Sequence, residues 1–157
     1  MCYDVRKKEF VMNLKECYAK FENLADGLKS LSLLAARLVL AYGFYGPAMR
    51  KWSDIGAIGD WFASLGIPFP QLNAYMAATT EITGVVLLTL GLFTRIISIP
   101  LIVVMLVAIF TVHLHNGFEC GNNGFEIPVY YMLFLVIFLS HGAGRFSLDN
   151  YIFAKKD

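Results

Sequence analysis

An apolar stretch from Ala74 to Phe93, with the carboxylate Glu81 near its middle, constrains this chain more than any other feature. The stretch has about 20 residues, which is enough to cross the hydrocarbon core of a bilayer as a helix. A carboxylate at that depth is costly unless it faces the protein interior and meets a partner. Arg37 is the one charge near the centre of the preceding apolar stretch. The sequence therefore predicts an Arg37–Glu81 ion pair between two antiparallel helices.

The composition predicts a membrane protein. Of the 157 residues, 57% are hydrophobic and 16% are charged, whereas a soluble domain carries roughly 25% charge. We expect an all-α fold, an integral membrane four-helix bundle that forms one domain over residues 28–149. Its expected spans cover about residues 28–49, 72–93, 96–115 and 126–142. A net charge of +1 gives no reason to expect a nucleic-acid partner.

Two helices are expected outside the spans. In residues 1–27, apolar residues recur at helical spacing and basic residues lie largely off that stripe, which predicts an amphipathic helix ending at Asp26 and Gly27. It lies either on the membrane surface or against the end of the bundle. The stripe consists of Phe10, Leu14, Cys17, Phe21, Leu24 and Leu28. A short interfacial helix is expected from Ser53 to Leu65, with Ser53 or Asp54 as its cap.

Lysine and arginine residues are concentrated on one side of the predicted bundle. That side holds Arg6, Lys7, Lys8, Lys15, Lys20, Lys29, Arg95, Arg145, Lys155 and Lys156. The other side holds Arg50 and Lys51. Because positive loops stay in the cytoplasm, both termini, including the tail at residues 150–157, are predicted to be cytoplasmic.

Further polar residues are expected near the opposite side. Glu126 opens the fourth predicted span where His113 closes the third, and Tyr130 follows one helical turn after Glu126. One interpretation places them at the mouth of a cavity that reaches Glu81 and Arg37. In the alternative, Glu126 favours the positive end of a helix dipole, His113 bonds to water or backbone, and the buried pair only fixes helix register.

No metal site is predicted, because His113 and His115 point about 200° apart on a helix. Trp52 and Tyr130 belong to a group of aromatic residues in the half of the bundle away from the termini. Such residues commonly form an interfacial belt or core. They would also suit a flat ligand with polar carbonyl groups, such as a quinone.

Several motifs, in order and spacing over about residues 34–151, give the chain a strong resemblance to the DoxX family of small bacterial membrane proteins. They are Arg37 with the glycine-rich exit and Lys51; Ala-Ser-Leu-Gly-Ile-Pro (63–68); Glu81 with Leu-Gly-Leu-Phe-Thr-Arg (90–95); the segment 105–113 ending at His113; Asn-Gly-Phe (116–118) before Gly-Phe-Glu-Ile-Pro (124–128); and Gly-Arg-Phe-Ser-Leu-Asp (144–149).

The resemblance implies a four-helix bundle in the bacterial inner membrane. It also matches a set of residues to the family's polar positions: Arg37, Lys51, Glu81, His113, Asn116 and Glu126. Some members of the family are subunits of a thiosulfate:quinone oxidoreductase, and others are linked to membrane complexes that handle oxidative or thiol stress. More distant relatives act in the assembly or trafficking of membrane proteins, so the family indicates architecture better than activity.

The first functional hypothesis is a quinone-interacting subunit of a membrane oxidoreductase, with Glu81, His113 and Glu126 exchanging protons. The residues expected to line the quinone site are Arg37, Lys51, Trp52, Asn116 and Tyr130. Electrons would come from an external reductant or a partner redox subunit. The alternatives are a non-catalytic scaffold or assembly factor and a proton-coupled small-solute transporter. The sequence is also compatible with a homo-oligomer.

Overall fold

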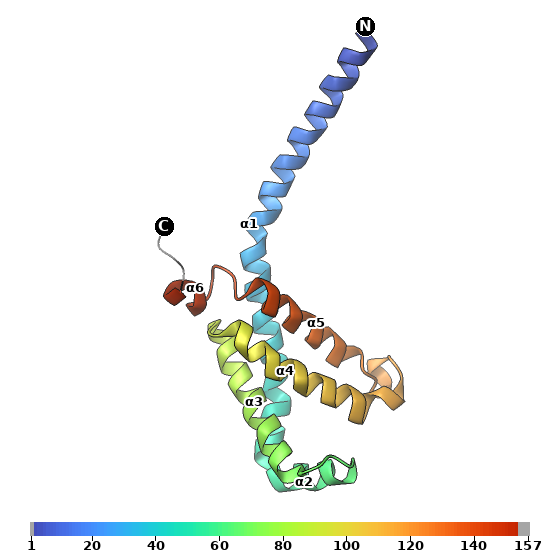
Figure 1. The fold of residues 1–157 in the computed structure, drawn as a ribbon, viewed down its shortest axis with the longest axis vertical. Coiled ribbons are helices and arrows are strands. Elements are labelled where there is room, and N and C mark those ends of the chain that lie inside the picture. Colours follow the sequence, from blue (N-terminus) through green and yellow to red (C-terminus); the bar gives the residue numbers. More distant parts are fainter. Residues whose placement is uncertain (1, 154–157) are drawn as a thin grey trace.

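The computed structural model describes the backbone of residues 2–153 and the side chains of residues 15–153. All regular secondary structure in that part of the chain is helical, as predicted (Figure 1). The predicted stripe residues Phe10 and Leu14, the basic side chains of Arg6, Lys7 and Lys8, and the tail residues Lys155 and Lys156 lie outside the described residues.

The first helix, α1, runs without interruption from Cys2 to Ser53. The break predicted at Asp26 and Gly27 is therefore wrong. A glycine inside a helix lowers helix stability by only about 1 kcal/mol relative to alanine. The hydrogen bonds of the long flanking helix offset that loss. The amino-terminal half of α1 projects away from the other helices (Figure 1). Its side chains from Lys15 to Lys29 are exposed, so this segment does not pack against the bundle.

The short helix expected after the first apolar stretch is present as α2, Ile55–Ser64. Asp54 caps it, because its side-chain oxygen accepts a hydrogen bond from the backbone N–H of Ala57 at 3.0 Å. Helix α3, Pro70–Leu90, then returns antiparallel to α1 and packs along it (Figure 1). We call this end of the bundle the α2 end.

A tight turn joins α3 to α4, Thr94–Ala108, as the sequence predicts. Gly91 adopts φ 66°, a left-handed conformation that glycine tolerates well. We call this end of the bundle the Gly91 end. Helix α4 continues into a π-helical segment, η1 (Ile109–His113), and a 3₁₀ turn, η2 (Leu114–Asn116).

The remaining elements are η3 (Cys120–Asn122), α5 (Glu126–His141) and α6 (Leu148–Phe153). Helix α5 packs on α4, and α1 packs on α3, so the bundle consists of two helix pairs joined mainly through α3 and α4 (Figure 1). The core between the pairs is formed by large apolar side chains that are at most 1% exposed: Leu40, Phe44, Leu88, Leu101, Leu135 and Phe138.

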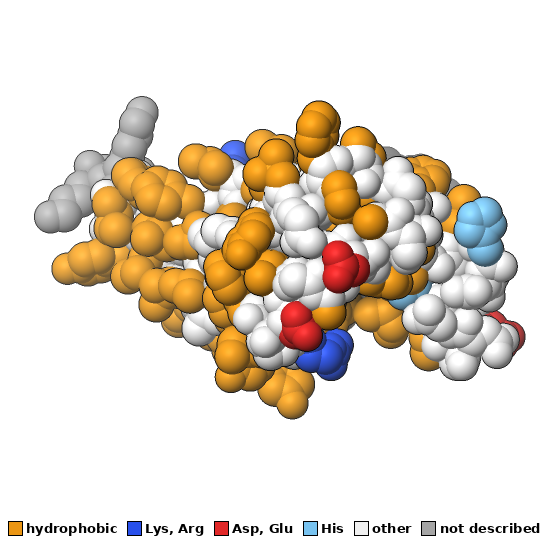
Figure 2. Space-filling model, turned by 90° about the horizontal axis from the view of Figure 1, so that it is seen from below, with side chains coloured by type: hydrophobic (Ala, Val, Ile, Leu, Met, Phe, Trp, Pro, Cys, Tyr) orange, Lys and Arg blue, Asp and Glu red, His pale blue; other side chains and the backbone are white. Residues whose placement is uncertain are grey.

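Among the described residues, one helical stretch is both long and apolar enough to cross a membrane, Thr94–Asn116 with 23 residues. Helix α5 is apolar but has only 16 residues. Helix α3 carries Thr79, Thr80 and Glu81 near its middle, and these polar residues lower its mean hydropathy. Length and composition thus identify one membrane span. Hydrophobic side chains nevertheless cover much of the surface seen from the α2 end (Figure 2).

Close packing of α1 on α5 generates a testable prediction. A Cβ atom at Gly43 would overlap the ring and hydroxyl of Tyr131, whose ring packs edge-on against Phe44 at a centroid distance of 5.3 Å. We expect Gly43→Ala to destabilise the protein by about 1–3 kcal/mol, since overpacking displaces a fixed ring. Thermal unfolding of the detergent-solubilised protein, followed by circular dichroism, measures the effect.

Gly27→Ala is the matched control, because nothing lies within 4 Å of a Cβ added at Gly27. This variant is expected to be neutral or stabilising by up to about 1 kcal/mol through helix propensity. Equal melting temperatures for wild type and Gly43→Ala would contradict the helix packing described above.

Candidate functional site

The central polar contact of the bundle joins Lys51 to Glu81. The Lys51 ammonium donates to both carboxylate oxygens of Glu81, at 2.9 and 2.8 Å. The Glu81 side chain is 3% exposed and the Lys51 side chain 16% exposed. A carboxylate in the middle of α3 is therefore held against the last turns of α1 by a two-oxygen ion pair.

This geometry corrects the predicted Arg37–Glu81 pair. Helical side chains lean toward the N-terminus of their own helix. On α1, Arg37 therefore leans toward the Gly91 end, whereas Glu81 on the antiparallel α3 leans toward the α2 end. The two side chains diverge, and Lys51 converges on Glu81 instead. The sequence-based pairing rests only on the distance of each residue from the end of its span. The direction of each side chain is the signal that would have identified Lys51.

Arg37 is fully buried and bonds to backbone oxygens at the Gly91 end. Its Nη1 donates to the Leu88 carbonyl at 2.9 Å, and its Nη2 donates to the Phe146 carbonyl. Gly91 leaves the room for this side chain, since a Cβ there would overlap the guanidinium. Arg37 thus ties α1 to the end of α3 and to the segment between α5 and α6. Its role as a quinone ligand near Glu81 has no support in these contacts.

Aromatic side chains lie beside the Lys51–Glu81 pair. The Trp52 indole N–H donates to the Ala78 carbonyl at 3.3 Å, which connects the same two helices. The Trp52 ring meets the Tyr75 ring edge-on, with centroids 6.3 Å apart. Both side chains remain more than 40% exposed. This end of α1 and α3 therefore combines a buried charge pair with accessible aromatic surface.

His113 and Asn116 lie on the turn that follows α4. His113 Nδ1 donates to the Asn123 carbonyl at 2.8 Å, and Asn116 donates to the same carbonyl at 3.2 Å. Asn123 has φ 60°, a left-handed conformation that asparagine adopts more readily than most residues. These two side chains hold the loop before α5 in place.

Glu126 and Tyr130 bond to one another on the first turns of α5. The Tyr130 hydroxyl donates to Glu126 Oε1 at 3.1 Å, and Cys120 N–H donates to Oε2 at 3.0 Å. Both carboxylate oxygens of Glu126 are thus engaged in ordering the loop.

The structure therefore separates the predicted cavity residues into distinct groups. Within residues 15–153, no hydrogen bond or ion pair connects Lys51 and Glu81 to His113, Glu126 or Arg37. In the same part of the chain, no cluster of three or more His, Cys, Asp or Glu side chains could hold a metal ion. Lys51 and Glu81 form a buried ion pair, and the other predicted site residues that the structure describes bond to loops and helix ends.

The contacts of Arg37 generate a prediction for stability. Arg37→Met removes two buried donors and leaves two carbonyl oxygens without them, so we expect a loss of about 2–4 kcal/mol. Arg37→Lys should recover only part of this loss, because a single ammonium cannot reproduce the planar fork of a guanidinium. Denaturation of the purified protein in mixed micelles measures the unfolding free energy of each variant.

Arg50→Met, at an exposed position on the same helix, is the control and should change stability by less than about 0.5 kcal/mol. Similar losses for Arg37→Met and Arg50→Met would contradict this role.

Comparisons with known proteins place the chain in a family. The model of the DoxX family matches residues 32–114. An uncharacterised protein of Haemophilus influenzae is 31% identical over 147 residues, which cover 88% of this chain and 91% of that protein. A Bacillus subtilis protein named "Putative oxidoreductase CatD" is 31% identical over 127 residues, which cover 80% of this chain and 90% of that protein.

An uncharacterised membrane protein of Mycobacterium tuberculosis is 30% identical over 131 residues, with 76% of this chain and 80% of that protein covered. No solved structure matches the chain. The family match spans the helices that carry Arg37, Lys51, Glu81 and His113. The chain therefore belongs to the DoxX family of membrane proteins.

Proposed function

We propose that this protein is a quinone-interacting subunit of a membrane oxidoreductase in the bacterial inner membrane. The observation that carries the proposal is the buried Lys51–Glu81 pair beside exposed aromatic side chains. Ionisable residues buried in a membrane protein commonly mark a path for ions, protons or substrates. The similarity to a protein named as an oxidoreductase supports the redox class.

The proposal places four segments across the bilayer: the part of α1 after Leu28, helix α3, helix α4 with its η1 and η2 continuation, and α5. Both termini then lie in the cytoplasm. This orientation leaves Arg50 and Lys51 as the cationic residues near the outward side, in keeping with the excess of basic residues in cytoplasmic flanks. The α2 end faces outward, and a quinone reaches it from the surrounding lipid.

Lys51 and Glu81 have complementary roles in this proposal. The Lys51 ammonium donates a hydrogen bond to a quinone carbonyl, and Trp52 and Tyr75 contact the ring. Reduction to the quinol takes up two electrons and two protons. A partner redox subunit or an external reductant supplies the electrons. Glu81, a carboxylate in its pair with Lys51, takes up each of the two protons from water on the outward side and passes it to a reduced carbonyl oxygen. His113, Asn116, Glu126 and Tyr130 act as positioning residues that order the neighbouring loop.

A non-catalytic scaffold or assembly factor is the second candidate. The observation that favours it is that both terminal nitrogens of Arg37 and both carboxylate oxygens of Glu81 are bonded to protein groups, as a structural role requires. The projecting half of α1 would then supply contact surface for a partner, since Phe21 and Leu24 are 65% and 69% exposed.

Quinone binding tests the first candidate. Protein purified from its native membrane in mild detergent should carry quinone when analysed by native mass spectrometry. Glu81→Gln and Lys51→Met should each lower quinone occupancy by about tenfold or more, because each removes a charge-assisted hydrogen bond. Glu119→Gln is the matched control, since it neutralises an exposed carboxylate in the loop before α5 and should keep the quinone.

Absence of quinone from the wild-type protein, even after incubation with a soluble quinone analogue, would refute the quinone proposal. Equal occupancy in wild type and Glu81→Gln would refute the role of the ion pair. The scaffold candidate instead predicts that the same variants act only through the amount of folded protein, and that one partner is consistently crosslinked.

A further inference from the structure

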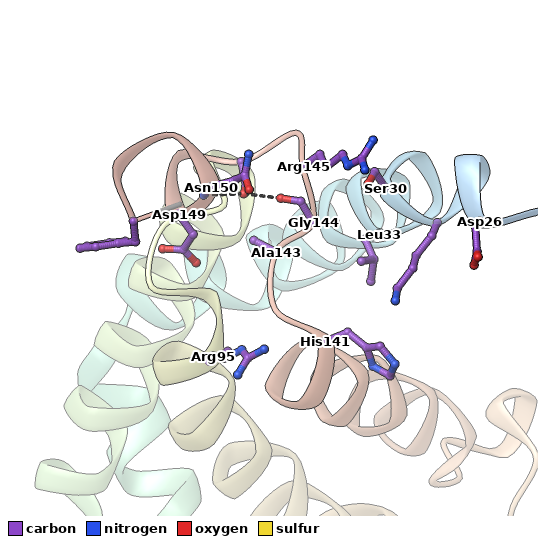
Figure 3. A pocket seen from close by; sticks show the side chains of 13 residues that line it. Asp26, Ser30, Leu33, Arg95, His141, Ala143, Gly144, Arg145, Asp149 and Asn150 are labelled. Atoms are coloured by element: carbon purple, nitrogen blue, oxygen red, sulfur yellow. Dashed lines mark hydrogen bonds between the residues drawn. The ribbon is translucent and has the colours of Figure 1, made fainter. Parts of the chain in front are cut away.

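An open cleft of about 730 Å³ lies at the Gly91 end of the bundle. Figure 3 shows the side chains that line it. Its walls come from α1, the start of α4, the end of α5, the segment that leads into α6, and α6 itself. Along α1, Ser30 in this cleft and Lys51 are 21 residues apart, or about 31 Å. The cleft is therefore a separate feature from the proposed quinone site.

The lining of the cleft is rich in cationic side chains. Lys29, Arg95 and Arg145 are positively charged at neutral pH, and the His141 ring lines the cleft with them. In Figure 3, Arg95 extends from α4 and His141 from the last turn of α5. Within residues 15–153, no hydrogen bond or ion pair engages the side chains of Lys29, Arg95 or Arg145. Their N–H donors are therefore available to an anion.

Two carboxylates line the same cleft, and they do not neutralise it. Asp149 accepts hydrogen bonds from the backbone N–H groups of Phe93 at 2.7 Å and Thr94 at 3.0 Å, so both of its oxygens cap α4. Asp26 is exposed on the projecting part of α1. With Asp149 directed at the helix end, the cations in the cleft outnumber the carboxylates that face it.

The wall formed by residues 142–150 is held in place by several contacts. The buried Arg37 donates to the Phe146 carbonyl, and the Asp149 N–H donates to the Gly91 carbonyl at 2.9 Å. Ser147 Oγ donates to the Gly144 carbonyl at 2.6 Å. Because this wall is tied to α1 and to the α3–α4 turn, the cleft is preorganised for a ligand.

Apolar side chains at this end of the bundle show which kind of anion fits. Ile96 on α4, next to Arg95, is 64% exposed, and Phe146, next to Arg145, is 59% exposed. Phe153 also lines the cleft and is 59% exposed. A cationic cleft beside apolar surface suits a ligand with a charged head and a hydrocarbon tail. Basic pockets between the helices of membrane proteins bind lipid head groups in this way.

We propose that this cleft binds the phosphate head group of an anionic phospholipid, with Arg95, Arg145 and Lys29 as phosphate ligands and the acyl chains along α4 and α5. The proposal commits to a membrane lipid as the source of the phosphate. It is independent of the quinone proposal, since it uses different residues and the other end of the bundle.

Lipid retention and thermal stability test the proposal with the full chain. Purified protein is incubated with phosphatidylglycerol, with zwitterionic phosphatidylcholine of the same acyl chains, or with inorganic phosphate. We expect native mass spectrometry to show retained phosphatidylglycerol, and the melting temperature to rise with this lipid alone. The double variant Arg95→Gln/Arg145→Gln should weaken phosphatidylglycerol binding by about tenfold or more, because it removes two charged phosphate ligands.

The matched control is Lys15→Gln/Lys20→Gln, which removes the same net charge from exposed positions on the projecting part of α1. It should bind phosphatidylglycerol like wild type, which separates the cleft from general electrostatic attraction. Circular dichroism verifies that both double variants fold.

Equal binding of the two lipids, or equal losses in the two double variants, would overturn the proposal. An equal rise in melting temperature with inorganic phosphate would overturn the assignment to a lipid. Neither result depends on quinone occupancy, so failure here is distinguishable from failure of the quinone proposal.

Discussion

The ion pair between Lys51 and Glu81 is the contact on which the rest of the bundle depends. A lone carboxylate buried among helices would cost several kcal/mol, and an ammonium group at 2.8 Å offsets that cost. Because the two residues lie on α1 and α3, the pair fixes the register of the two helices that make the largest contact in the fold. The same register brings Trp52 to the Ala78 carbonyl and Arg37 to the Leu88 carbonyl.

This register divides the polar residues between the two ends of the bundle. At the α2 end, a charge pair with restricted access to solvent lies next to exposed aromatic rings. At the Gly91 end, Arg37 and Asp149 fasten the chain segment after α5 to the α3–α4 turn, and a cationic cleft opens beside it. The proposed proton and quinone chemistry belongs to the first end, and the proposed lipid site belongs to the second.

Much of the fold could be predicted from the sequence, because its signals are local. Asp54 caps a short helix after a polar break, and Gly91 ends α3 before a tight hairpin. The family could also be predicted, since its motifs are ordered along the chain. The continuity of α1 through Asp26 and Gly27 could not be predicted, because turn-forming residues are weak signals within a long helix. The number of membrane crossings remains a prediction, because composition and length identify one span.

The partner of Glu81 could not be predicted from the depth of each charge within its helix. The depth of Arg37 along its predicted span agrees with its position on α1. Depth alone, however, does not give the direction in which the side chain extends. A long side chain reaches one to two helical turns, so direction decides between Arg37 and Lys51 as partner. The cleft at the Gly91 end could not be predicted from the sequence either, because its cationic residues come from segments that meet only after folding.

The most direct test of the account is a double-mutant cycle on unfolding free energy with Lys51→Met, Glu81→Gln and the double variant in mixed micelles. The account predicts a coupling energy of about 2 kcal/mol or more for this pair, because removing either partner leaves a buried charge or acceptor. A parallel cycle with Arg37→Met and Glu81→Gln should give a coupling below about 0.5 kcal/mol. Strong coupling of Glu81 to Arg37, with none to Lys51, would contradict the register on which the proposed site is built.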